Sequence, residues 1–279
     1  MKKTTVGVTI VGRDHGGIVA AFTNFAFSSG GNIEKVNQNV IKGLFGMYLE
    51  ISFAKKTNAA KFDSQIQLLA RKQKMDVSTH HGTSLRKNIA VFVTKEPHCL
   101  EMILKNSRTL GGRIALIVGT EKSLAMMAKK AKIPFVLVSG RSQQKAEEKI
   151  ITACKKYNID LIALARYMRI LSPNFVWRYP ERIINIHPSI LPAFPGAMAY
   201  AQAHERGTKI IGVTSHYVTE NLDQGPIILQ DSFKVDPDDT LEQIKKRGQK
   251  LEATTLLKAV RMHLAGKLDV RWRKVHLRK

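Results

Sequence analysis

The stretch of sequence that decides the fold is Ile183-Ile184-Asn185-Ile186-His187-Pro188-Ser189. Its isoleucines fall on both faces of an extended chain, which is the pattern of a buried parallel strand. Because side chains alternate along a strand, Asn185 and His187 project to the same side. Pro188 has no N–H group and cannot continue a central strand, so the strand ends beneath these two polar groups. Open α/β sheets bind ligands at such carboxyl ends.

The residues that follow also have the character of a binding site. Residues 191–196 contain two prolines and a glycine, which predicts a rigid, non-helical loop. Residues 210–218 are rich in strand formers and include His216. The turn at 219–226 then presents Asp223 beside a Gly-Pro pair. We therefore expect an amide, two histidines and a carboxylate at the ends of neighbouring strands.

The N-terminal part of the chain has the order βαββαβ, which predicts a ferredoxin-like unit. Its first helix carries apolar residues along one stripe and is expected to end at Gly30-Gly31. A polar stretch from His80 to Ser84 opens a linker. The expected strands are 6–11, 32–40, 44–53 and 75–80, and the expected helices are 18–29 and 58–74.

From Asn88 onward strands and helices alternate, which predicts a doubly wound, mostly parallel, Rossmann-like sheet. The long helix at 241–263 is expected to start with Asp239 and Glu242 in a capping-box arrangement. The predicted domains are 5–84 and 88–279. The other expected strands are 89–92, 114–118, 135–138, 161–164, 183–186, 210–218 and 227–230, and the other expected helices are one ending at 104 and those at 122–132, 143–157, 173–177 and 199–205.

The composition limits the class of protein. The 279 residues include 45 basic and 22 acidic ones, a formal net charge of +23. Such a charge is typical of a nucleic-acid or membrane-surface partner, of an anionic substrate, or simply of a basic solvated surface. The basic residues are scattered and are densest only at 271–274, so we expect no nucleic-acid partner.

Two cysteines in scattered positions, Cys99 and Cys154, fit a reducing compartment and predict a cytoplasmic location. The Cys and His residues do not have zinc-site spacing, so we expect no metal. No apolar run approaches about 20 residues, so we expect no membrane span.

At this point a family resemblance becomes specific. The segments 185–189, 191–196 and Leu222-Asp223-Gln224-Gly225-Pro226 resemble, in order, the catalytic signature of folate-dependent formyltransferase domains. This resemblance runs from about Asn88 to Leu264. The loop Asp14-His15-Gly16-Gly17-Ile18-Val19 is similar to that of ACT domains, although Gly16 stands where that family usually has proline.

An ACT-like unit joined to a formyltransferase domain resembles the formyltetrahydrofolate deformylases. Residues 93–100 are similar to the Ser-Lys-x-x-His-Cys-Leu run of that family. Glycinamide ribonucleotide formyltransferases instead carry a glycine-rich phosphate loop there, and this chain has no glycine between Asn88 and Leu110. Two segments depart from the deformylase pattern: Pro188 stands where those enzymes commonly have histidine, and Thr120-Glu121 where they tend to have Asn-His.

The resemblance implies hydrolysis of 10-formyltetrahydrofolate to formate and tetrahydrofolate, which would feed purine and one-carbon metabolism. The folate is then the substrate, and no tightly bound cofactor is expected. Asn185 and His187 would donate hydrogen bonds to the oxyanion, Asp223 would activate water, and His216 would support them. The implied substrate-binding residues are Arg166, Tyr167, Met168, Ile170, Leu171, Ser189, Gly196, Val218 and Leu222. The implied effector-binding residues are Asp14, Gly16, Gly17 and Ile18.

Two other interpretations stay open. The His187-Pro188-Ser189 form is the one usual in transferases and keeps open transfer of the formyl group to an amine acceptor. The charge and the departures keep open a non-catalytic protein that binds an effector or nucleic acid on the same fold. In each case we expect a homo-oligomer assembled through the ACT-like unit, with an amino acid as the possible effector.

Overall fold

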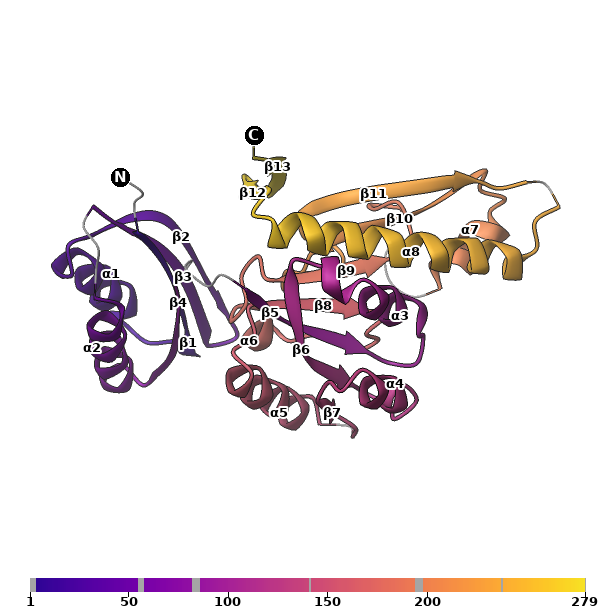
Figure 1. Cartoon of the computed structure of the whole chain (residues 1–279). Coiled ribbons are helices and arrows are strands. Elements are labelled where there is room, and N and C mark those ends of the chain that lie inside the picture. Colours follow the sequence, from indigo (N-terminus) through magenta and orange to yellow (C-terminus); the bar gives the residue numbers. More distant parts are fainter. Residues whose placement is uncertain are drawn as a thin grey trace. The chain divides into compact units, whose positions relative to one another are not determined.

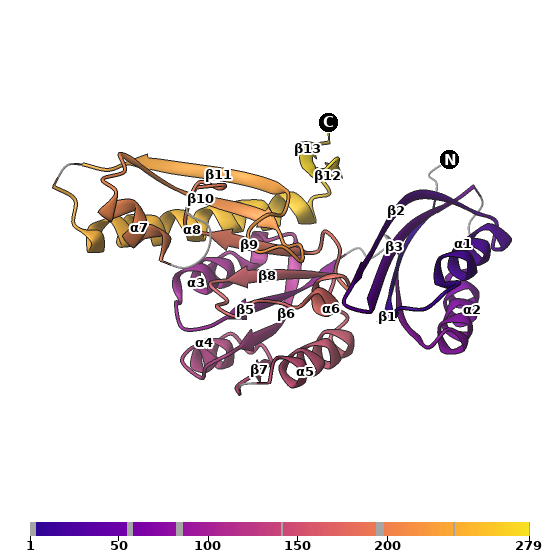
Figure 2. The same cartoon turned by 180° about the vertical axis from the view of Figure 1, so that it is seen from behind.

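The computed structural model describes residues 4–54, 58–81, 86–140, 142–193, 198–236 and 238–278. Contacts between residues divide the chain into two compact units, shown in Figures 1 and 2. The first unit contains Met1–Leu85 and Ser172–Pro180. The second unit contains Arg86–Leu171 and Glu181–Lys279.

The first unit is an antiparallel four-stranded sheet with two helices, in the predicted order βαββαβ. The sheet order is β2-β3-β1-β4. Phe22 and Ile66, one from each helix, are buried in a cluster with the strand residues. The ferredoxin-like prediction is therefore confirmed. Its elements are β1 (Thr4–Arg13), α1 (Ile18–Ser28), β2 (Gly31–Ile41), β3 (Leu44–Phe53), α2 (Ala59–Lys72) and β4 (Met75–His81).

The short helix α6 (Pro173–Val176) belongs to this first unit by its contacts. The Trp177 ring lies so close to Gly46 that a Cβ atom there would be 2.3 Å from it. Arg178 forms an ion pair with Asp76. Residues 172–180, from the second half of the sequence, thus pack with the first unit.

The second unit is a seven-stranded sheet with the order β11-β10-β9-β8-β5-β6-β7. The strands from β9 to β7 pair in parallel, whereas β10 pairs antiparallel with both β9 and β11. The prediction of a mostly parallel sheet is confirmed. The strands are β5 (Lys87–Val93), β6 (Gly112–Gly119), β7 (Phe135–Leu137), β8 (Leu161–Ala165), β9 (Ile183–His187), β10 (Ile210–Tyr217) and β11 (Ile227–Lys234).

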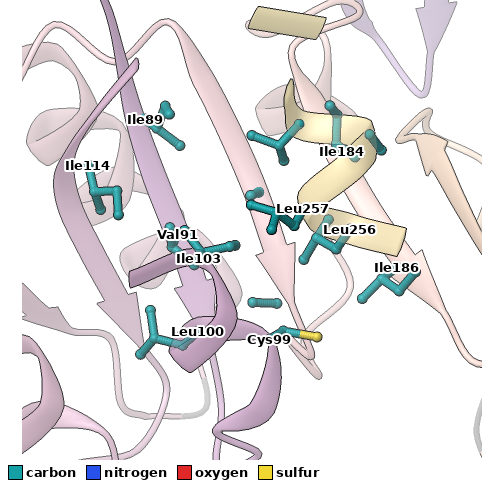
Figure 3. Packing of buried hydrophobic residues seen from close by; sticks show 14 of the residues in the cluster. Ile89, Val91, Cys99, Leu100, Ile103, Ile114, Ile184, Ile186, Leu256 and Leu257 are labelled. Atoms are coloured by element: carbon teal, nitrogen blue, oxygen red, sulfur yellow. The ribbon is translucent and has the colours of Figure 1, made fainter. Parts of the chain in front are cut away.

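Helices α3 and α8 cover one region of this sheet (Figure 3). Leu100 of α3 and Leu256 of α8 are buried among Val91 and Ile184 of the strands. Each such side chain contributes roughly 1.5–3 kcal/mol when it leaves water. Packing of this core therefore fixes the positions of the strands that carry Asn185, His187 and His216. The helices of this unit are α3 (His98–Lys105), η1 (Ser107–Thr109), α4 (Ala125–Lys130), α5 (Gln143–Lys156), α7 (Ala199–Glu205) and α8 (Leu241–Leu264).

Three details differ from the sequence-based expectations. The N-cap of α8 is Thr240, paired with Gln243 in a capping box, and not Asp239, which forms an ion pair with Arg247. The helix expected at 122–132 is confined to Ala125–Lys130. A hairpin of β12 (Leu268–Arg271) and β13 (Lys274–Leu277), whose valines pack on the core, was not predicted.

In the part of the chain that the structure describes, no helix combines the length and the apolar character needed to cross a membrane.

Candidate active site

The polar side chains of β9 and β10 face each other across an antiparallel pair. Asn185 of β9 is the register partner of His216, and His187 is the partner of Thr214. Because β10 is antiparallel, its last residue Tyr217 lies beside Ile184, near the start of β9. His216 thus lies near the end of β10, the strand next to β9, as expected, whereas the antiparallel direction of β10 was not predicted.

The loop after β10 returns toward His187 because Gly225 allows it to lie against the strand. A Cβ atom on Gly225 would be 1.7 Å from the Tyr217 carbonyl oxygen, so only glycine fits at this approach. The Tyr217 N–H donates to the Pro226 carbonyl at 2.9 Å. Asp223 itself has a left-handed backbone with φ of 55°. Such conformations of non-glycine residues concentrate at functional sites.

Four polar side chains converge as a result. The Asp223 carboxylate lies 3.4 Å from Nδ1 of His187 and 3.7 Å from Nε2 of His216. The amide nitrogen of Asn185 lies 3.3 Å from Nε2 of His216. The Asp223 side chain is only 6% exposed. A carboxylate, two imidazoles and an amide therefore share one partly desolvated site, where electrostatic interactions are strengthened.

The hydrogen bonds of His216 fix the orientation of the Asn185 amide. Nδ1 of His216 lies 2.8 Å from the Tyr217 carbonyl oxygen, which can only accept. Nδ1 therefore carries a hydrogen, and in the neutral ring Nε2 accepts an N–H from Asn185. The amide nitrogen carries a second hydrogen, which remains available to a ligand.

These residues line a cavity of about 280 Å³. Its wall contains seven of the expected substrate-binding residues: Arg166, Tyr167, Met168, Ile170, Leu171, Val218 and Leu222. Large apolar side chains stay exposed here, namely Met168, Ile170, Met198 and Leu222. Apolar groups with a few convergent polar ones are typical of a small-molecule site.

Hydrogen bonds hold the wall segment that follows β8 in place. The Met168 N–H donates to Oγ1 of Thr94 at 3.0 Å, and the Thr120 hydroxyl donates to the same oxygen at 3.0 Å. Arg169 donates to the carbonyl oxygens of Val138 and Gly140 at 3.2 and 3.1 Å. Thr120, one of the departures from the deformylase pattern, therefore supports the cavity wall through Thr94.

Tyr167 supplies a neutral aromatic wall. Its ring packs against Phe92 with centroids 5.3 Å apart. Burial raises the pKa of the Tyr167 phenol to about 12. The hydroxyl therefore stays protonated at physiological pH.

Two expected substrate-binding residues have a different placement. Ser189 is not among the described residues that line the cavity, and its hydroxyl donates to the Ala193 carbonyl. Its own carbonyl accepts from the Thr214 hydroxyl at 2.7 Å. Ser189 thus holds the loop and does not face the cavity. Gly196 lies outside the described residues.

Sequence reasoning missed several wall residues. Met198 is 74% exposed and has a left-handed backbone with φ of 62°. Nothing in the local sequence marks it as a cavity residue. Arg169 stood between two expected residues and could have been included on that ground. The other wall residues that were missed are Leu164, Ile186, Pro188, Thr219, Glu220 and Asn221.

The expected effector loop lines a separate depression in the first unit. Asp14, Gly17 and Ile18 belong to its lining, together with His15, whereas Gly16 does not. Both ring nitrogens of His15 lie 3.0 Å from carbonyl oxygens, those of Gly16 and Gln73. These two acceptors raise the pKa of His15 above its ordinary value of 6.5.

Comparison with known proteins agrees with this two-part organisation. Residues 87–260 match the formyl transferase family, and residues 4–80 match the ACT domain family. Apart from residues 172–180, which pack with the first unit, these two matches correspond to the two units, and together they cover most of the chain.

Full-length relatives carry both parts. A formyltetrahydrofolate deformylase of Bacillus subtilis is 38% identical over 265 residues, which is 92% of this chain and 88% of that protein. A crystal structure of a formyltetrahydrofolate deformylase from Pseudomonas syringae pv. tomato has a TM-score of 0.69 and 31% identity, and covers 100% of this chain and 96% of that chain.

A transferase matches a smaller part of the chain. The glycinamide ribonucleotide transformylase 1 of Symbiobacterium toebii has a TM-score of 0.67 and 31% identity, and covers 72% of this chain and 97% of that chain. The deformylases, in contrast, are similar to this chain along nearly its whole length. The chain therefore belongs to the formyltetrahydrofolate deformylase family of enzymes.

Proposed function

We propose that this enzyme hydrolyses the N10-formyl amide of 10-formyltetrahydrofolate and releases formate and tetrahydrofolate. The observation that carries the proposal is the convergence of Asn185, His187 and Asp223 on one cavity. Its apolar rim suits the flat pterin ring, and its polar base suits attack on a carbonyl carbon. The substrate class follows from the deformylase relatives.

In the proposed reaction, negative charge develops on the formyl oxygen as water attacks the carbon. The free N–H of the Asn185 amide and an N–H of His187 would donate to this oxyanion. Each donor of this kind contributes roughly 3–4 kcal/mol to transition-state stabilisation in comparable sites. The orientation of Asn185 by His216 supports this role, because an amide fixed beforehand need not reorganise during the reaction.

Asp223 would accept a proton from the attacking water and deliver it to the leaving nitrogen. The C–N bond then breaks, and the products are the secondary amine and formic acid, which loses its proton to become formate. General acid–base assistance of this kind is worth about 10²–10⁴-fold. His216 would orient the Asn185 amide through Nε2 and would not itself exchange the proton.

The remaining expectations are part of the same proposal. The formate would supply purine and one-carbon metabolism, and the depression at Asp14 and Ile18 would bind an amino-acid effector. Four expectations stay predictions. They are assembly into a homo-oligomer, the cytoplasmic location, the domain limits at 5–84 and 88–279, and the lack of a nucleic-acid partner.

A direct assay tests the reaction. Purified protein is incubated with 10-formyltetrahydrofolate, and formate and tetrahydrofolate are measured with and without a primary amine acceptor. Equal amounts of both products without acceptor are the expected result. Turnover only in the presence of acceptor would contradict hydrolysis and favour formyl transfer, the alternative that the similarity to a transformylase keeps open.

Substitution of Asp223 tests the mechanism. Asp223→Asn removes the proton acceptor while keeping the size of the side chain, so kcat should fall by about 10²–10⁴-fold. Asp231→Asn is a matched control, because Asp231 lies on β11, accepts from the Ser232 N–H at 2.9 Å, which asparagine can also do, and forms an exposed pair with Lys258 at 3.8 Å. Wild-type turnover in Asp223→Asn, with unchanged circular dichroism, would refute the role of this carboxylate.

A further inference from the structure

A buried carboxylate outside the proposed catalytic group is bound by three side chains. Glu252 of α8 is 0% exposed. The Tyr200 hydroxyl donates to its Oε1 at 2.7 Å. Nε2 of His98 lies 3.2 Å and Nε of Arg166 lies 3.5 Å from its Oε2. Four separate segments, α3, the end of β8, α7 and α8, therefore meet at one carboxylate.

The cluster requires a cation, and Arg166 supplies it. A buried carboxylate is costly unless a charge and hydrogen-bond donors compensate it. Burial and the Glu252 charge raise the pKa of Tyr200, so this phenol stays a neutral donor. Arg166 has a left-handed backbone with φ of 60°, which costs a non-glycine residue about 1–2 kcal/mol. The surrounding contacts therefore hold Arg166 in an otherwise unfavourable conformation.

Arg166 lines the same cavity as the proposed catalytic group. It comes two residues after Leu164, which is the register partner of Asn185. Nε of Arg166 faces Glu252 at 3.5 Å as an ion pair without a hydrogen bond, and among the described residues no hydrogen bond engages either Nη atom. Arg169, the other arginine of the wall, is instead committed to backbone carbonyls.

The same cluster also contains donor atoms that could hold a metal. Atoms of His98, Cys99 and Glu252 lie within 4.8 Å of one another. However, the Arg166 guanidinium already faces the carboxylate oxygen that a cation would need. Burial also raises the pKa of Cys99, which disfavours the thiolate that binds metals. The charges of this cluster therefore favour an anion at its open side.

We infer that Arg166, held by Glu252, binds the carboxylate of the product formate in this cavity. A guanidinium with two free Nη groups matches the two oxygens of a carboxylate. Formate exists only after hydrolysis, and it forms beside the Asp223 carboxylate, which repels it. A fixed cation would offset this repulsion. The inference rests on the proposed function for the identity of the carboxylate.

Formate binding can be measured without turnover, by ligand-observed NMR on the full-length protein. Wild-type protein should bind formate saturably. Arg166→Gln should weaken formate binding by about tenfold or more, because charge-assisted hydrogen bonds are lost. Glu252→Gln should weaken it less, because the guanidinium remains but is no longer held. Lys258→Gln, on the exposed side of α8, is the control and should bind as the wild type does.

A double-mutant cycle separates positioning from a merely structural role. If Glu252 acts through Arg166, adding Glu252→Gln to Arg166→Gln should cause no further loss of formate binding. An additive loss, or normal formate binding by Arg166→Gln, would overturn the inference. Tyr200→Phe keeps the ring packed on Gly248 and removes only the 2.7 Å bond, so it replaces Glu252→Gln if that variant does not fold.

Two further measurements distinguish formate from other ligands of this cluster. If the carboxylate is instead the glutamate group of the folate, Arg166→Gln will weaken binding of tetrahydrofolate and leave formate unaffected, which overturns the inference. Stoichiometric metal that is lost in His98→Ala would also overturn it. Absence of hydrolysis by a wild-type protein that still binds formate through Arg166 would count against the proposed function alone.

Discussion

At the scale of single residues, Asp223 reaches the cavity because of its neighbour Gly225. The loop between β10 and β11 folds back onto the Tyr217 carbonyl, and the contact leaves no room for a side chain. The proposed catalytic geometry thus depends on a residue that contributes no functional group. His216 has a comparable supporting role. Its Nδ1 bonds the Tyr217 carbonyl, which leaves Nε2 to accept from the Asn185 amide and so orients that amide.

We predict that Gly225→Ala lowers kcat by about 10²-fold, since a displacement of the order of 1 Å is enough for such a loss. The Cβ atom would force the loop away from β10 and carry Asp223 with it. The measurement is formate release at saturating substrate. Gly266→Ala is the control: its φ of 67° strains alanine, but no atom lies within 4 Å. It should lose about 1 kcal/mol of stability and keep its turnover. Equal turnover in the two variants would contradict the prediction.

At the scale of elements, α8 connects the core to the cavity wall. Its apolar residues pack in the core with α3, and Glu252 on the same helix bonds Tyr200 of α7. The helix begins at Thr240, whose hydroxyl accepts from the Gln243 N–H at 3.3 Å. The Gln243 side chain accepts in return from the Thr240 N–H at 2.7 Å. This capping box satisfies amide groups that would otherwise lack partners.

Thr240→Ala should therefore destabilise the second unit by about 1 kcal/mol. For a unit of this size the midpoint of thermal unfolding should fall by about 2–4 °C, followed by circular dichroism. Thr240→Ser keeps the hydroxyl and should unfold close to the wild-type temperature. An unchanged midpoint in Thr240→Ala would show that the cap contributes nothing to stability.

At the scale of the whole molecule, the reactivity of the two cysteine thiols can be used to follow unfolding of the second unit. Cys99 and Cys154 are buried, and neither forms a disulfide with another described residue. Burial, followed by the Glu252 charge, raises the pKa of Cys99 well above its ordinary value, so its thiolate is scarce. A thiol reagent at neutral pH should react with neither residue in the native protein, and with both once denaturant unfolds this unit. The Cys154→Ala variant isolates the Cys99 signal. Rapid native reaction of one thiol would contradict the burial.

Several features of the fold and site could be predicted from local sequence. The alternation of apolar residues gave the order of strands and helices, because periodicity reflects which face is buried. Pro188 marked the end of β9, because a residue without an N–H cannot continue a central ladder. The errors were the β12–β13 hairpin, which was not predicted, and boundaries such as the start of α8, where Asp239 and Thr240 are both good caps and only the observed bonds distinguish them.

Other features depend on contacts between distant segments. The antiparallel direction of β10 places His216 against Asn185, and no local pattern specifies strand direction. The segment Ser172–Pro180 packs with the first unit although it lies within the sequence of the second. The cluster at Glu252 joins residues from four segments, and nothing local to His98 or Arg166 indicates that both meet Glu252.

The sequence by itself determined the elements, their order and the identities of Asn185, His187 and Asp223, because these follow from backbone chemistry and from motifs of neighbouring residues. The tertiary structure alone decided how these groups meet His216 and how Glu252 holds Arg166. The reason is that hydrogen bonds and ion pairs between distant segments form only after packing has fixed the strand register and helix positions.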